Sequence, residues 1–141
     1  MTDDHSTPMF QGKCLCGAVS VRLQHKKPSM SVCHCGMCRR WAGGPSMTLA
    51  SHAAPQIDGS EHVRTYASSD WAQRGFCAQC GTHLFYRLRN GEFYAIPVGL
   101  FEAGGDWPFK LQVFIDEKPG NYRFADRTDE MTGDEVFKAW S

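Results

Sequence analysis

The sequence has 141 residues, of which 42% are apolar and 21% charged, and its 15 basic side chains balance its 15 acidic ones. A chain of this length fits one domain with a hydrophobic core of its own. The zero formal net charge argues against a general nucleic-acid binder, which carries a basic excess, and no apolar run approaches the roughly 20 residues of a membrane-spanning helix. We therefore expect one globular domain that binds neither nucleic acid nor a membrane.

The N-terminal stretch "MTDDHSTPMFQGK" lacks the basic and then apolar order of a secretion signal. We interpret residues 1–11 as a mobile N-terminal tail and residues 12–141 as the single folded domain. Because no targeting segment is recognised here, we predict a cytoplasmic protein.

Alternation of apolar and polar residues predicts strands along most of the chain. In residues 18–25, Val19, Val21 and Leu23 alternate with smaller or polar residues, as in a strand with one buried face. Further strands are predicted at 30–33, 46–50, 62–67, 83–88, 92–100 and 109–116. The Asn-Gly pair within residues 89–92 is typical of a tight hairpin. The pattern predicts a mainly β domain of antiparallel sheets.

Helix signals are weak and local. One or two turns are predicted after Cys35, ended by Gly43 and Pro45, and a second short helix is predicted over residues 134–140 with Asp134 as its N-cap. The helices are therefore minor elements of the predicted fold.

Cysteine is the residue type that carries the chemistry. In a reducing compartment, clustered cysteines are metal ligands or catalytic thiols more often than disulfides. There are seven, an odd number, and they divide by spacing into four and three: Cys14, Cys16, Cys33, Cys35, Cys38, Cys77 and Cys80.

The first predicted site has four ligands. "FCAQCGTHLF" (residues 76–85) contains C-x2-C followed by glycine, which is a zinc knuckle, and "KCLCGA" (residues 13–18) offers a second pair that also ends in glycine. We predict a structural zinc ion bound by both pairs, which can contribute on the order of 10 kcal/mol to folding. Buried free thiols are the alternative. The predicted ligands are Cys14, Cys16, Cys77 and Cys80.

The second predicted site has three ligands, Cys33, Cys35 and Cys38, which can reach one ion if the chain turns tightly at Gly36. Zinc sites with an open fourth position are of the catalytic type. A thiol at that position would be deprotonated by the metal, against a free thiol pKa near 8.5. The vacancy therefore suits a substrate thiol.

Two alternatives remain for this second group. His34 or His83 could complete a closed structural site. The C-x2-C pair Cys35 and Cys38 is also that of a thiol-disulfide oxidoreductase, although the βαβ pattern that accompanies such a motif is missing from the sequence. The other histidines are interpreted as exposed or bonded to neighbours.

Arginines flank both cysteine groups. Arg39 and Arg40 follow Cys38 and Arg74 precedes the knuckle, and guanidinium groups are well suited to carboxylates. Taken singly, each arginine is more typical of solvated surface charge. The aromatic residues nearby are interpreted as core: Trp41, Phe76, Phe85 and Tyr86.

Four stretches, "GKCLCGAVSVRL", "CHCGMCRRWAG", "FCAQCGTHLFYR" and "QVFIDEKPG", resemble the glutathione-dependent formaldehyde-activating enzyme family, of which centromere protein V is a distant relative. They occur in the family's order, and all seven cysteines of the family pattern are present. The resemblance implies a β-tent fold with two zinc ions per chain, a structural ion at positions 14, 16, 77 and 80 and a second ion at positions 33, 35 and 38.

The activity implied by the resemblance is condensation of formaldehyde with glutathione to S-(hydroxymethyl)glutathione, a carbon-sulfur bond formation classed with the lyases. We therefore predict a zinc-dependent carbon-sulfur lyase-type enzyme acting on a small thiol adduct, with a thiol such as glutathione as its partner and no cofactor besides zinc. The alternative from another class is a non-catalytic, zinc-stabilised binding module. No catalytic residue is predicted beyond the second zinc site.

Overall fold

The computed structural model describes residues 7–91 and 93–140, and within them the fold is mainly β with two short helices. The helices are α1 (Gly36–Ala42) and α2 (Gly133–Trp140). The strands are β1 (Met9–Lys13), β2 (Ser20–Gln24), β3 (Met30–Cys33), β4 (Ser46–Ser51), β5 (Gln56–Asp58), β6 (Val63–Tyr66), β7 (Ala72–Cys77), β8 (His83–Leu88), β9 (Tyr94–Pro97), β10 (Phe109–Val113) and β11 (Asp129–Met131).

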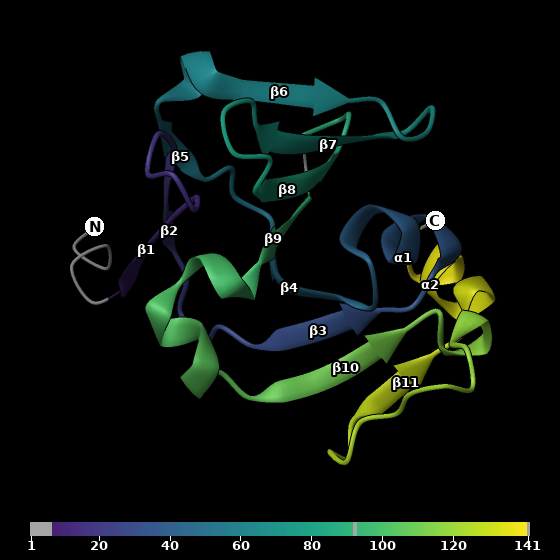
Figure 1. Ribbon diagram of the computed structural model, residues 1–141. Coiled ribbons are helices and arrows are strands. Elements are labelled where there is room, and N and C mark those ends of the chain that lie inside the picture. The colour runs from purple at the N-terminus through teal and green to yellow at the C-terminus, as the bar shows by residue number, and fades with distance from the viewer. Residues whose placement is uncertain (1–6, 92, 141) are drawn as a thin grey trace.

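The strands form two sheets. A three-stranded sheet has the order β1-β2-β5, and an eight-stranded sheet has the order β11-β10-β3-β4-β9-β8-β7-β6. In Figure 1 the large sheet runs from β6, β7 and β8 at the top through β9 and β4 to β3, β10 and β11 at the bottom, and both helices lie at the same end of the molecule. The small sheet lies at the opposite end, near the N-terminus.

The hydrophobic core joins the two sheets. Val21 and Leu23 of β2 are almost fully buried, as the predicted alternation requires, and they belong to one cluster with Leu49 of β4 and Ile96 of β9. Burial of each such side chain contributes about 1.5–3 kcal/mol. Because side chains alternate along a strand, the neighbours of Leu49 face away from this core. That other face of the large sheet carries the pocket described below.

Most predicted strands are present, but two end early. Residues 92–100 were predicted as one strand, whereas β9 ends at Pro97 and a 3-10 turn, Val98–Leu100, follows. Residues 109–116 were also predicted as one strand, but Phe114 adopts a left-handed backbone conformation (φ 55°) that ends β10. Residue 92 lies outside the described residues. The strands β1, β5, β7 and β11 were not predicted.

The prediction of antiparallel sheets is wrong at two pairings. β10 pairs in parallel with β3 on one side and with β11 on the other, whereas the other strand pairs are antiparallel. Parallel neighbours need a long crossover connection rather than a tight hairpin. Residues 114–128 supply that connection between β10 and β11.

The folded part of the chain begins earlier than predicted. Residues 9–11, assigned to the N-terminal tail, belong to β1, where Met9 pairs with Gln24 and Gln11 with Arg22. Residues 1–6 lie outside the described residues. That the rest of the chain forms one domain stays a prediction.

The second helix begins one residue before the predicted range, and Thr132 caps it in place of Asp134. The Thr132 hydroxyl accepts a hydrogen bond from the Glu135 amide (3.2 Å), and the Glu135 carboxylate accepts one from the Thr132 amide (2.8 Å). This reciprocal pair is a capping box, which holds the first turn of α2 in place. Among the described residues, no helix is long and apolar enough to cross a membrane.

Candidate metal centres

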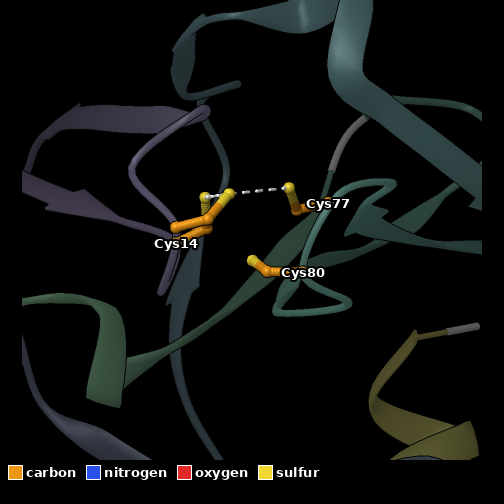
Figure 2. Close-up of side chains that lie close together, drawn as sticks. Cys14, Cys77 and Cys80 are labelled. Atoms are coloured by element: carbon orange, nitrogen blue, oxygen red, sulfur yellow. Dashed lines mark hydrogen bonds between the residues drawn. The ribbon is translucent and has the colours of Figure 1, made fainter.

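Four cysteines from two distant loops converge in what we call the four-cysteine cluster: Cys14, Cys16, Cys77 and Cys80. Their sulfur atoms all lie within 4.8 Å of one another. Figure 2 shows Cys14 reaching toward Cys77 and Cys80 from a separate part of the chain. The cluster therefore connects the loop between β1 and β2 with the turn between β7 and β8, as the sequence predicted.

Glycine turns shape both loops. Gly17 and Gly81 adopt left-handed φ angles of 82° and 80°, which glycine reaches without a steric penalty. The Gly17 amide donates to the Cys14 carbonyl (3.0 Å) and the Gly81 amide to the Cys77 carbonyl (2.8 Å). The chain thus folds back on itself after each cysteine pair.

The sulfur spacing fits a tetrahedral metal ion. The Cys16 sulfur lies 3.7 Å from that of Cys14 and 3.8 Å from that of Cys77. Four thiolates around a zinc ion, each about 2.3 Å from the metal, would be about 3.8 Å apart. The cluster could therefore hold a metal ion.

The surroundings of this cluster favour the thiolate form of Cys80 and Cys14, but not of Cys16. The hydrogen bond of the Ala18 backbone lowers the pKa of Cys16, whereas burial and hydrogen bonding with the other three sulfurs outweigh it and raise this pKa to about 12. Hydrogen bonds from the hydroxyl and backbone of Thr82 lower the pKa of the Cys80 thiol to about 5. Burial raises the pKa of Cys14, but the Val19 amide, which donates to its sulfur at 3.3 Å, and the neighbouring sulfurs outweigh burial and lower it. Deprotonated sulfur is the form that binds metal.

Cys33, Cys35 and Cys38 form the second group, the three-cysteine cluster, with all three sulfurs within 4.8 Å of one another. Cys33 ends β3, Cys35 is the N-cap of α1, and the Cys38 amide donates to the Cys35 sulfur (3.4 Å). The tight turn predicted at Gly36 takes the form of a helix start, and the Gly36 amide donates to the Glu117 carboxylate (3.0 Å).

A buried guanidinium group lies beside the three-cysteine cluster. Arg74 is only 4% exposed, and its two terminal nitrogens lie 3.7 and 3.6 Å from the Cys38 sulfur. Its guanidinium group also lies over the rings of Trp41 (5.9 Å) and Tyr86 (5.0 Å), within cation-π range. The interpretation of Arg74 as solvated surface charge is therefore wrong. Its partner Cys38 is 36 positions away, so sequence spacing gave no sign of the contact.

Hydrogen bonding among the three sulfurs shifts their pKa values in opposite directions. Hydrogen bonds from Cys33 and Cys38 lower the pKa of Cys35 to about 2, and the positive charge of Arg74 acts in the same direction. Hydrogen bonding with Cys35 and Cys38, together with burial, raises the pKa of Cys33. These shifts favour a thiolate at Cys35 among closely packed sulfurs, an arrangement that suits a cation.

The neighbouring histidine is not a ligand. His34 is fully buried, and both of its ring nitrogens are hydrogen-bonded, Nδ1 to the Tyr122 hydroxyl (2.8 Å) and Nε2 to the Gln112 side-chain oxygen (2.8 Å). His83 stacks on Trp41 (4.5 Å between ring centroids) and is not part of either cluster. A second site closed by His34 is therefore contradicted by the structure.

A pocket of about 600 Å³ opens beside the three-cysteine cluster, and its lining includes Cys33, Cys35 and Cys38. Residues of β3, β4, β9 and β10 line it on the sheet side, on the face opposite the core, and both helices contribute to it. Tyr86, predicted as core, is half-buried and faces this pocket. Among the residues that line it, none comes from the four-cysteine cluster.

The three arginines singled out in the sequence therefore have different positions. Arg40 is exposed and lines the pocket, whereas the Arg39 side chain donates to the His34 carbonyl (2.9 Å) and is not among the lining residues. Arg74 lines the pocket and binds the Cys38 sulfur.

These features define a mainly β protein with two cysteine clusters that could each bind a metal ion, one of them open to a pocket. A family model described as "Glutathione-dependent formaldehyde-activating enzyme" matches residues 9–117. The chain belongs to this family.

Individual proteins are also similar to the chain. A Schizosaccharomyces pombe protein named as an uncharacterized lyase is 40% identical over 133 residues, which cover 94% of this chain and 97% of the relative. A Rhodobacter sphaeroides protein of known crystal structure has 25% sequence identity to this chain, and its structure matches with a TM-score of 0.55. The match covers 71% of this chain and 99% of that one. Family and relative together support a formaldehyde-activating, lyase-type role.

Proposed function

We propose that the protein is a zinc-dependent carbon-sulfur lyase-type enzyme that joins a small thiol, such as glutathione, to an electrophilic carbon such as formaldehyde, and releases it in the reverse direction. One observation carries this proposal: three clustered cysteine sulfurs line a pocket large enough for a small molecule. The family and the relative named as a lyase support the reaction class.

In this proposal the four-cysteine cluster holds a structural zinc ion and the three-cysteine cluster a second one, so that a chain carries two. The sulfur spacing supports the first assignment. Cys33, Cys35 and Cys38 would hold the second ion, and zinc bound there would supply Lewis-acid chemistry that lowers the pKa of a substrate thiol.

The chain's own residues hold the sulfurs in place. The Cys38 amide fixes the Cys35 sulfur, and the Arg74 guanidinium group donates to the Cys38 sulfur while its charge offsets part of the negative charge of the thiolates. Such outer contacts orient the ligands of a metal site and tune its affinity. Arg74 is therefore a positioning residue in this proposal.

The reaction is balanced without a redox partner. The thiol gives up a proton, its sulfur forms a bond to the carbonyl carbon with its electron pair, and the carbonyl electron pair moves to the oxygen, which takes up a proton. No electrons are gained or lost overall. The protein supplies an activated sulfur and a pocket that holds it beside the carbon.

The test is thiol binding to fully metallated protein. We expect glutathione and 2-mercaptoethanol to bind, as measured by calorimetry. The binding should become tighter as the pH rises toward the thiol pKa, because binding releases a proton. Cys38→Ser should abolish this binding, whereas Arg64→Gln, an exposed site on β6, should not change it.

Formation of the hydroxymethyl adduct from formaldehyde, followed by NMR, should be faster with the enzyme than without it. Thiol binding without this acceleration would remove formaldehyde as the substrate. The absence of any thiol binding would contradict the proposal and favour the zinc-stabilised binding module.

A further inference from the structure

The sheet side of the pocket carries a row of hydroxyl groups that begins beside the three-cysteine cluster. β3 and β4 are neighbours in the large sheet (Figure 1), and in their register Cys33 lies opposite Ser46. Residues directly opposite each other on one face have Cβ atoms about 4.5–5.5 Å apart. The next pair on this face, Ser31 and Thr48, lies two residues along the strands, which is roughly 7 Å away. All three hydroxyl-bearing residues line the pocket.

Small side chains follow this row on the same face of the sheet. Ala50, two residues beyond Thr48, pairs with Ala95 of β9, and both line the pocket. Their methyl groups fill little of the space above the sheet. A ligand whose sulfur lies at the three-cysteine cluster can therefore extend along β3 and β4 with the hydroxyl groups beneath it.

Two more hydroxyl groups belong to the segment between β6 and β7. Ser68 and Ser69 line the pocket, their side-chain oxygens are buried, and within the described part of the chain neither oxygen has a hydrogen-bond partner. Buried polar groups without a partner are rare in native proteins, because burial removes their hydrogen bonds to water. Rotation about one side-chain bond redirects a serine hydroxyl. A ligand in the pocket is therefore the partner that these two groups lack.

The segment that carries these serines is held at both ends. Tyr66, the last residue of β6, stacks on Trp41 of α1 with 6.2 Å between ring centroids. After the serines, the Trp71 carbonyl accepts a hydrogen bond from the Arg89 amide (2.8 Å). The start of the segment is thus held against α1, the helix that carries Cys38.

The pocket also has a cation for an acidic group. In the described part of the chain, its charged lining residues are Arg40, Arg74 and Glu117. Arg74 donates to the Cys38 sulfur, and Glu117 accepts the Gly36 amide. Arg40 is exposed, and a guanidinium group can form two parallel hydrogen bonds to a carboxylate. Arg40 is therefore placed to bind a carboxylate of the ligand.

We propose that these groups form a polar subsite, which binds the amide and carboxylate groups of a peptide thiol and makes the site prefer such a thiol to a plain one. A hydroxyl group both donates and accepts, so it suits the N–H and C=O groups of a peptide backbone. The inference rests on the proposed function, because it requires the thiol sulfur at the three-cysteine cluster. It adds the side chains that recognise the rest of the substrate. The polar subsite consists of Ser31, Ser46, Thr48, Ser68, Ser69 and Arg40.

The test compares glutathione, a peptide thiol, with 2-mercaptoethanol by calorimetry on the fully metallated full-length chain. We expect glutathione to bind at least tenfold more tightly. Thr48→Val removes one hydroxyl group with little change of shape and should reduce the ratio of the two affinities about three- to tenfold, as loss of one hydrogen bond would. Thr65→Val, at an exposed position of β6, is the matched control and should keep the ratio.

Arg40→Gln should reduce the same ratio about tenfold, because it removes the charge that would pair with a carboxylate. Arg64→Gln, exposed on β6, is its control. Ser68→Ala and Ser69→Ala give a second readout. Each removes a buried hydroxyl without a partner, so we expect the melting temperature of the thiol-free protein to stay the same or rise while the affinity ratio falls.

The outcomes separate this inference from the proposed function. Equal affinities for the two thiols, an unchanged ratio in Thr48→Val or Arg40→Gln, or equal losses for both thiols in these variants would overturn the inference while the proposed function stands. Serine variants with a lower melting temperature and an unchanged ratio would also overturn it, because the hydroxyls would then serve the fold. If Thr48→Val does not fold, Ser31→Ala tests the same row. Absence of binding by either thiol would overturn both proposals.

Discussion

The four-cysteine and three-cysteine clusters both offer cysteine sulfur atoms. The cysteines of the first cluster lie far apart in the sequence, whereas those of the second lie close together. The four-cysteine cluster joins residues 14 and 16 to residues 77 and 80, across the two sheets. The three-cysteine cluster lies within residues 33–38, and a buried guanidinium group and a pocket adjoin it. A metal ion bound between distant segments would hold the two sheets together, whereas one bound within a single turn would hold only local structure.

In the proposed function, this difference gives the two clusters separate tasks. Four sulfurs complete a tetrahedral site and leave no position for a substrate. Three sulfurs beside a cavity leave one side open, and because they stabilise only a local turn, the fold depends on them less. The predictions below test this division, beginning with the largest expected effect.

The largest expected difference is between Cys77→Ser and Cys38→Ser. Cys77→Ser removes one of four ligands from the site that connects the sheets, and a structural zinc contributes on the order of 10 kcal/mol, comparable with the whole stability of a small domain. We expect this variant to be unfolded, as measured by circular dichroism. Cys38→Ser should stay folded with a moderately lower melting temperature. Equal destabilisation by the two changes would contradict the division of tasks.

A chelator should remove the two metal ions one after the other. We expect purified protein to carry close to two zinc ions per chain, and a mild chelator to take the ion of the three-cysteine cluster first, because three protein ligands hold less firmly than four. Metal analysis during a chelator titration, with Cys38→Ser as the reference for the four-cysteine cluster alone, measures this order. A single firmly held ion, with Cys35 and Cys38 forming a disulfide at a cellular glutathione potential, would support the oxidoreductase alternative.

Arg74→Gln should lower the metal affinity of the three-cysteine cluster and leave that of the four-cysteine cluster unchanged. Loss of an outer partner of a metal ligand costs about 10–100-fold in metal affinity. We expect a decrease of this size at the three-cysteine cluster, measured by competition with a chromophoric chelator, and no change at the four-cysteine cluster. Arg64→Gln is the control, since Arg64 is exposed on β6. Arg74→Lys should restore part of the affinity; equal losses at both clusters would mean that Arg74 acts only through the fold.

The smallest expected effects concern the glycines next to the cysteines. Gly81→Ala places a side chain on a left-handed residue (φ 80°) and should lower the free energy of unfolding by about 1–2 kcal/mol. Gly36→Ala lies at the start of α1, where the nearest atom to a new methyl group is 3.8 Å away, so we expect little change or a slight gain. Chemical denaturation of the two variants checks this contrast. A comparable loss in Gly36→Ala would show that both turns need glycine.

The fold was predictable where the pattern was local and regular. Residues 30–33 and 83–88 have the strand bounds read from alternation. β7 was missed because Arg74 and Gly75 interrupt its apolar pattern, although both are buried: Arg74 beside Cys38, and Gly75 where a side chain would come within 2.3 Å of the Phe85 ring. The partner that explains each residue lies on another element, Cys38 on α1 and Phe85 on β8, so the sequence of β7 itself does not contain it.

What the sequence determined by itself was the grouping of the cysteines and the mainly β fold, because ligand spacing, glycine turns and strand alternation act over a few neighbouring residues. Tertiary structure alone decided that Arg74 lies beside the Cys38 sulfur and that α2 lines the pocket. It also decided that the ring nitrogens of His34 are hydrogen-bonded to Tyr122 and Gln112. These contacts depend on the register and direction of strand pairing. A shift of one residue in a strand turns every side chain to the opposite face, and no local pattern records which distant partner then stands opposite.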